Sequence, residues 1–220
     1  MSSPADARPG SFGLIVIGDE ILNGNRTDKH LPVFRAMLGE RGHGLAWCWI
    51  LPDDPALLTR QLAASMDAEL PVFCCGGIGA TPDDHTRACA AVAAGVELVR
   101  HPAALALIED RFGAEAHPHR VLMADLPAGA TLIPNPVNQI PGFALHGHWF
   151  LPGFPRMAWP MAEWVLDRHY PPSTPTAEAA VAVWQTPESH LIPLMQRLDG
   201  VCPGLKLFSL PHLGEDPADR

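Results

Sequence analysis

The sequence lacks the features that direct a chain to nucleic acid, a membrane or export. Its 15 Lys and Arg form no basic run and the formal net charge is −9, so nucleic acid is not an expected partner. No apolar stretch approaches the roughly 20 residues that a membrane-spanning helix needs. Residues 1–8 have no apolar core of the kind that a secretory signal carries. We therefore expect a cytoplasmic protein that contacts neither membrane nor nucleic acid.

Cysteine is also scarce, and its spacing excludes common uses. The five cysteines show neither zinc-binding nor redox-motif spacing. Reduced and mostly buried thiols are the expectation. With 220 residues, of which 47% are hydrophobic, the chain can form one substantial α/β domain and a small appendage.

Apolar runs and helix-start signals alternate over the first part of the chain. The expected strands are 12–17, 45–51 and 72–75, and the expected helices begin at Thr27 or Asp28, at Asp53–Pro55 and at Thr81. This alternation predicts an α/β fold in three layers, with a doubly wound, mainly parallel sheet. Such sheets bind ligands at the carboxyl ends of their strands.

The second part is rich in proline and less regular. Strands are expected at 131–133 and 148–151, followed by a helix at 156–169 and a linker at 171–175. We expect one domain over residues 1–170 and a short α/β tail over 176–220. In that tail we expect a strand at 179–184, a helix at 189–198 and a strand at 205–210.

The most informative segment joins the third expected strand to its helix. Gly76, Gly77 and Gly79 lie between them, and such a loop can bring backbone N–H groups close to a phosphate. Asp83 and Asp84 follow and would repel a bare phosphate. Together these residues predict a phosphorylated ligand bound with Mg²⁺ or another hard divalent cation.

Four further motifs occur in order around this loop, at residues 18–24, 134–136, 141–143 and 151–155. With the glycine loop, they make residues 12–170 resemble the MoaB/Mog-type molybdopterin-binding domain family. The resemblance is closest to the amino-terminal domain of the competence/damage-inducible (CinA) proteins, and the tail resembles the start of the small domain that follows there. The sequence departs from the family pattern at Lys29, Ala80 and His85.

The resemblance implies a small phosphorylated ligand and leaves its identity open. A molybdopterin-like pterin is one candidate and a nucleotide is the other. It also leaves three activities open: ligand binding, metal-dependent cleavage or transfer at a phosphoanhydride such as that of ADP-ribose, and a non-catalytic, homo-oligomeric binding module. A tryptophan-bearing helix at 156–169 is the expected oligomer interface.

The candidate site residues follow from these motifs. Asp84 and Asp19 are the catalytic candidates, and Asp83, Asp84 and Glu20 are the candidate metal ligands. The candidate ligand-binding residues are Gly76, Gly77, Gly79, Thr81, Thr86, Asn135, Pro152 and Gly153. Simpler roles stay open for some of them: a helix cap for Asp83, local hydrogen bonds for Thr81 and Thr86, and loop stiffening for the prolines.

Overall fold

The computed structural model describes residues 10–174 and 177–211 of the chain. The chain forms two compact units, Met1–Thr176 and Ala177–Arg220, and each is described by itself.

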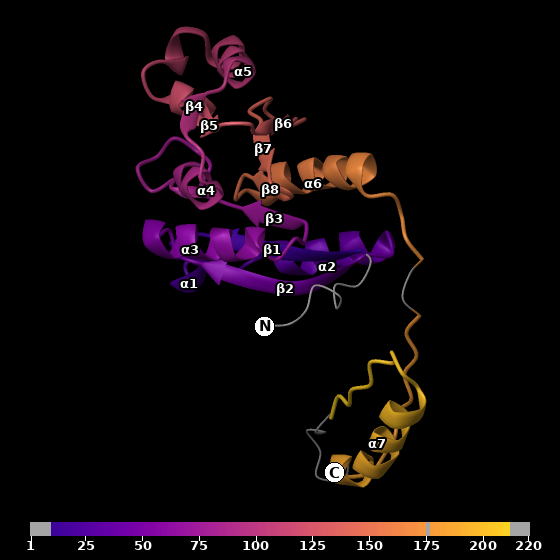
Figure 1. Ribbon diagram of the computed structural model, residues 1–220. Coiled ribbons are helices and arrows are strands. Elements are labelled where there is room, and N and C mark those ends of the chain that lie inside the picture. The colour runs from indigo at the N-terminus through magenta and orange to yellow at the C-terminus, as the bar shows by residue number, and fades with distance from the viewer. Residues whose placement is uncertain (1–9, 175–176, 212–220) are drawn as a thin grey trace. The chain divides into compact units, whose positions relative to one another are not determined.

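The first unit is built on a mixed sheet of six strands in the order β2-β1-β3-β8-β7-β6 (Figure 1). The four strands β2, β1, β3 and β8 are parallel, whereas β7 and β6 join as an antiparallel edge. Their bounds are β1 Ser11–Ile17, β2 Gly44–Leu51, β3 Val72–Cys75, β6 Thr131–Ile133, β7 Gly142–Leu145 and β8 His148–Leu151. The predicted α/β fold with a mainly parallel sheet is confirmed, and β7 is a strand that the sequence did not reveal.

Helices cover both faces of this sheet. On β1, Leu14 and Val16 pack toward α2 (His30–Glu40) and α6 (Pro155–His169). Their neighbours Ile15 and Ile17 pack toward α3 (Pro55–Met66) and α4 (Thr86–Ala94). Successive side chains of a strand point to opposite faces, so the uninterrupted apolar run of β1 serves two cores at once.

Residues 98–127 form a small lobe that the sequence analysis described only as irregular. It pairs β4 (Leu98–Arg100) with β5 (Asp125–Pro127) in an antiparallel ribbon. The connection contains α5 (Pro102–Phe112) and the 3-10 turns η2 (Gly113–Ala116) and η3 (Arg120–Ala124). Pro102 opens α5 and His101 caps it by accepting a hydrogen bond from the Ala104 N–H.

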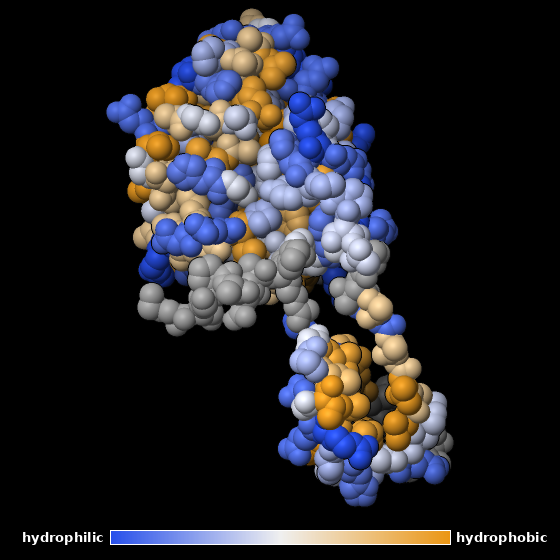
Figure 2. All heavy atoms as spheres, turned by 45° about the vertical axis from the view of Figure 1, so that its right-hand side comes forward, coloured by the Kyte–Doolittle hydropathy of each residue, from blue (hydrophilic) through white to orange (hydrophobic). Residues whose placement is uncertain are grey.

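The second unit differs from its expectation. Its described residues contain η4 (Glu188–His190) and α7 (Ile192–Val201), so the helix is present. The expected strands at 179–184 and 205–210 are not strands in the described part, because neither run has a partner strand to pair with. Apolar side chains of this unit gather around a hollow (Figure 2). The most exposed large hydrophobic residues in its described part are Val181, Trp184, Phe208 and Leu210.

A buried histidine links α3 to β8. Its environment implies that the stability of the fold decreases at acid pH. His148 is fully buried, with Nε2 at 2.8 Å from Ser65 Oγ and Nδ1 at 3.0 Å from the His146 carbonyl oxygen. Burial lowers the pKa of this imidazole below its ordinary value of 6.5. Because the folded pKa lies below the unfolded one, stability is complete above about pH 6.5 and is lost as the pH falls beneath it.

We expect the free energy of unfolding in urea to fall between pH 7.5 and 5.5, by up to about 1 kcal/mol for each buried histidine. The measurement is urea unfolding at several pH values in this range. His148→Asn should reduce the slope, since one titrating group is gone. Equal unfolding free energies at the two ends of the range would show that the buried imidazole does not control stability.

Candidate functional site

Three loops meet where β1, β3 and β8 end. They are the segment from Gly18, the glycine loop from Gly76, and the turn at Gly153. A β-carbon on Gly76 would lie 2.2 Å from the Ile17 carbonyl oxygen, and one on Gly153 would lie 3.4 Å from the Gly76 α-carbon. These approaches bring the three predicted motifs together at the carboxyl edge of neighbouring parallel strands, where doubly wound sheets bind ligands.

The first turn of α4 holds the glycine loop through hydrogen bonds to its carbonyl oxygens. The Thr86 hydroxyl donates to the Gly76 carbonyl oxygen at 3.0 Å, and the Thr86 N–H donates to that of Gly77 at 3.0 Å. An Arg87 guanidinium nitrogen donates to the Gly79 carbonyl oxygen at 2.7 Å. Thr86 is fully buried, so its hydroxyl serves the conformation of the loop in this structure.

These three contacts determine where the loop directs its donors. In a trans peptide the carbonyl oxygen and the following N–H point in opposite directions. The N–H groups of Gly77, Ile78 and Ala80 therefore point away from the donors of Thr86 and Arg87 that hold the preceding carbonyls. Within the described ranges, none of the three donates a hydrogen bond. Successive unpaired N–H groups of this kind form an anion-binding concavity.

The end of the loop is a local turn, which corrects the predicted helix start. Asp84 accepts hydrogen bonds from the Thr81 N–H at 2.8 Å and the Thr81 hydroxyl at 2.5 Å. The helix α4 then begins at Thr86, with His85 at its N-cap position and no side-chain cap. The expected start at Thr81 and the cap role of Asp83 are wrong, because side-chain bonds of this turn compete with helical ones.

Carboxylates gather at the same edge. Asp19 and Asp53 exchange hydrogen bonds: the Asp19 N–H donates to Asp53 Oδ2 at 3.0 Å, and the Asp53 N–H donates to Asp19 Oδ1 at 3.3 Å. The pKa of Asp53 is raised, first by burial and then by the charges of Asp19, Glu20 and Asp83. Asp53 thus joins three predicted site residues, although we expected it only at a helix start; its place at the end of β2 was the available signal.

These carboxylates suit a metal ion that the protein and a phosphorylated ligand bind together better than one that the protein binds alone. Across residues 10–174 and 177–211, no group of three or more His, Cys, Asp or Glu side chains could hold a metal ion. Asp19 and Asp53 each engage one oxygen in their mutual contact and retain another. Because Mg²⁺ needs only one or two carboxylates when phosphate and water complete its shell, this donor set fits a hard cation bound jointly with a phosphorylated ligand.

The remaining predicted residues lie around the start of α6. Pro152 and Gly153 precede it, and the buried His30 places Nε2 at 3.1 Å from the Gly153 carbonyl oxygen. Asn135 is buried and accepts from the Val137 N–H at 3.0 Å within the loop after β6. That loop reaches α6 through Asn138, which contacts the Met157 sulfur at 3.1 Å. Sequence reasoning missed His30 because nothing in its neighbourhood marks a partner 123 residues away.

Comparison with known proteins identifies the domain. The family model described as "Probable molybdopterin binding domain" matches residues 13–171, which include all three loops. The chain belongs to this molybdopterin-binding domain family. A CinA-like protein of Geobacter sp. strain M21 is 35% identical over 149 residues, covering 64% of this chain and 36% of that protein. A protein of Pyrobaculum arsenaticum is 27% identical over 208 residues, covering 90% of this chain and 78% of that one.

One solved structure agrees with the family assignment. The CinA protein of Thermoplasma acidophilum, described as of unknown function, superposes with a TM-score of 0.66 at 27% identity, covering 72% of this chain and 96% of that one. The chain spans about a third of the length of CinA-like relatives such as the Geobacter protein. Among the helices in the described ranges, none has the length and apolar character to cross a membrane.

Proposed function

We propose that this molybdopterin-binding-type domain binds a small phosphorylated ligand, a pterin or a nucleotide, at the carboxyl edge of β1, β3 and β8. The observation that carries the proposal is the set of unpaired N–H groups at Gly77, Ile78 and Ala80, because such groups bind phosphate oxygens. Gly76, Gly77 and Gly79 provide the close approach, and Thr81, Pro152 and Gly153 lie on the rim.

A hard divalent cation completes this proposal. Carboxylates crowded beside the loop would repel a bare phosphate, and Mg²⁺ or Mn²⁺ removes that repulsion. Asp19 and Asp53 would hold the cation, with Glu20, Asp83 and Asp84 as further candidates. Ligand and cation should then bind with positive and reciprocal coupling.

Calorimetric titration with molybdopterin, ADP-ribose, FAD and ATP, each with and without Mg²⁺, tests the proposal. We expect at least one of these ligands to bind, and to bind more tightly with the metal. Absence of binding by all four would refute it. Equal affinities with and without metal would remove the bridging role of the carboxylates.

A matched pair of glycine variants connects that binding to the loop. A β-carbon on Gly79 would lie 2.5 Å from Asp84 Oδ2, whereas one on Gly39 meets nothing within 4 Å. Gly79→Ala should therefore displace the Asp84 turn and weaken ligand binding about tenfold or more, while Gly39→Ala should leave affinity unchanged. Equal affinities of the two variants would place the ligand elsewhere.

A second candidate function is metal-dependent cleavage of a phosphoanhydride. The gathering of Asp19, Glu20, Asp53 and Asp83 beside the loop favours it, because a metal held by carboxylates can stabilise charge on phosphoryl oxygens. Product analysis after incubation with ADP-ribose and Mn²⁺ distinguishes cleavage from binding alone. Asp19→Asn should abolish any turnover; turnover that survives it would assign the chemistry to other residues.

We propose a cytoplasmic homo-oligomer that contacts neither nucleic acid nor membrane. Trp159 and Trp164 on α6 are only partly exposed and pack against the core, so the interface on this helix would use their outer edges. Light scattering tests the oligomeric state, and a monomer at all concentrations would refute it.

A further inference from the structure

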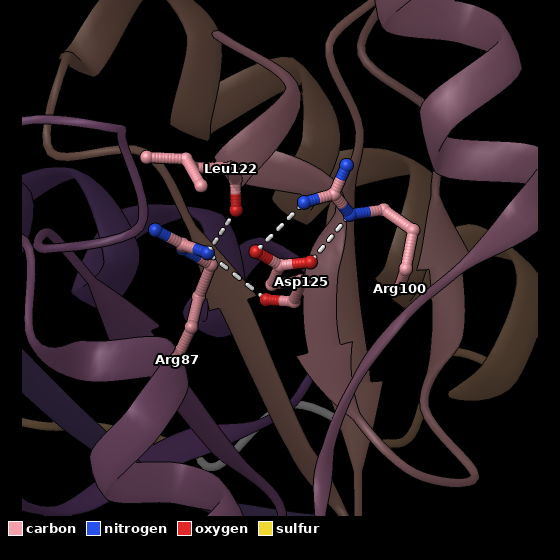
Figure 3. A network of polar contacts seen from close by, with 4 residues as sticks. All are labelled: Arg87, Arg100, Leu122 and Asp125. Atoms are coloured by element: carbon pink, nitrogen blue, oxygen red, sulfur yellow. Dashed lines mark hydrogen bonds and ion pairs between the residues drawn. The ribbon is translucent and has the colours of Figure 1, made fainter. Parts of the chain in front are cut away.

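Arg87 lies between the glycine loop and the small lobe of residues 98–127 and donates hydrogen bonds to both. It lies in the first turn of α4, directly after Thr86, and is only 8% exposed. Its guanidinium donates to three backbone carbonyl oxygens. One is that of Gly79 in the glycine loop at 2.7 Å, and the other two belong to Leu122 and Asp125 of the small lobe, the latter at 2.9 Å. Figure 3 shows the two contacts with the lobe.

A neighbouring ion pair completes the network. Asp125 directs its carboxylate to Arg100, with Nε to Oδ1 at 2.5 Å and Nη2 to Oδ2 at 3.1 Å (Figure 3). Arg100 therefore fixes the lobe internally, from β4 to β5, and in the described part of the chain it donates no hydrogen bond to the glycine loop. Arg87 uses the carbonyl of the same Asp125 and continues to Gly79. Within this cluster, Arg100 therefore holds the lobe together and Arg87 connects the lobe to the glycine loop.

The chemistry of the guanidinium suits this task. It is planar and presents five donors in a fixed fork, whereas an ammonium group is a compact point charge on a flexible stem. Two nitrogens of the Arg87 fork can therefore reach carbonyls of the lobe and of the glycine loop at the same time. Burial lowers the pKa of Arg87, and the charges of Asp125 and Asp84 oppose that effect. The group remains a cation at neutral pH.

We infer that Arg87 is a positioning residue that couples the glycine loop to the lobe of residues 98–127. Its bond to the Gly79 carbonyl sets the orientation of the following peptide, and so of the Ala80 N–H. Its bonds to Leu122 and Asp125 hold the lobe against that loop. The part of this inference that concerns ligand affinity rests on the proposed function, whereas the part that concerns loop order does not.

Loss of this anchor should appear as a population effect. Without the bond to Gly79, the loop samples orientations that no longer direct the Ala80 N–H to the ligand. The apparent affinity equals the intrinsic affinity multiplied by the fraction of molecules that keep the competent orientation, so it falls as that fraction falls. Removing a hydrogen bond made by a charged donor corresponds to roughly a 10- to 100-fold effect.

The test compares Arg87→Met with Arg100→Met. Both changes remove a guanidinium from the same cluster and keep an unbranched stem, but only the first removes the contact with Gly79. The first readout is hydrogen exchange of the Asp84 and Thr86 amides in the ligand-free protein, since both are hydrogen-bonded within the loop. The second is the dissociation constant for ADP-ribose with Mg²⁺.

Arg87→Met should accelerate the exchange of these amides and raise the dissociation constant, each about tenfold or more. Arg100→Met should change both by less than about threefold. Arg87→Lys, which keeps the charge and can reach one carbonyl, should recover part of the loss. Wild-type exchange rates and affinity in Arg87→Met would overturn the inference. If the wild-type protein does not bind ADP-ribose, the ligand proposal fails for that compound while loop exchange still decides the role of Arg87.

A measurement on the unmodified protein covers the case in which Arg87→Met does not fold. Saturation with ADP-ribose and Mg²⁺ should slow exchange both in residues 76–86 and in residues 120–127. Protection confined to 76–86 would show that the loop and the lobe are not coupled. In that case the hydrogen bonds of Arg87 with Leu122 and Asp125 would stabilise the fold without coupling the lobe to the glycine loop.

Discussion

Gly76→Ala is expected to lower the free energy of unfolding by about 3 kcal/mol or more. Gly76 has φ at +122°, a conformation that side chains with a β-carbon rarely adopt. The added β-carbon would lie 2.2 Å from the Ile17 carbonyl oxygen. That oxygen belongs to β1, which pairs with β2 and β3 on its two sides, so the strand cannot move away. Urea unfolding measures the effect.

Gly95→Ala is the control for this expectation. Gly95 also has positive φ, at +68°, but a β-carbon there meets nothing within 4 Å. Gly95→Ala should lower the free energy of unfolding by only about 1 kcal/mol, the contribution of the left-handed conformation alone. Equal losses for the two variants would mean that the close approach of the glycine loop to β1 does not constrain the site.

Phe73→Ala is expected to lower the free energy of unfolding by about 3–5 kcal/mol. Phe73 is fully buried on β3, with its ring 5.0 Å from that of Phe34 and 5.7 Å from that of Phe12. Its removal leaves a cavity between the central strand and α2, which close packing prevents from collapsing fully. Chemical denaturation measures the loss.

Phe154→Ala removes the same number of atoms from a side chain that is 58% exposed. It should change the free energy of unfolding by less than about 1 kcal/mol. A loss of that size for Phe73→Ala would show that the strand leading into the glycine loop is not held by this aromatic cluster.

The layered sheet could be predicted from the sequence because its signals are local. The apolar runs at 12–17 and 72–75 are fully buried strands, and the acidic residue before Pro55 caps α3, where the Asp54 side chain accepts from the Leu57 N–H at 2.6 Å. The position of three loops at one edge also followed, since parallel strands end on the same side. These features depend on residues close together in the chain.

The parts that escaped prediction depend on contacts across long separations or on competition between local motifs. Arg87 binds carbonyls 35 and 38 residues away, and no residue pattern encodes a backbone acceptor. The start of α4 shifted because the Thr81–Asp84 turn competes with a helical turn that the same residues favour. In the tail, apolar runs that resemble strands had no partner to pair with.

The backbone N–H groups of the glycine loop are proposed to bind the phosphate of the ligand. An amide-resolved titration of the protein with molybdopterin or ADP-ribose, in the presence of Mg²⁺, tests this contact residue by residue. We expect the largest and saturable chemical-shift changes at the amides of Gly77, Ile78 and Ala80, with smaller ones at Asp19 and Gly153. Saturable binding that leaves those three loop amides unchanged would show that the phosphate does not bind at the glycine loop.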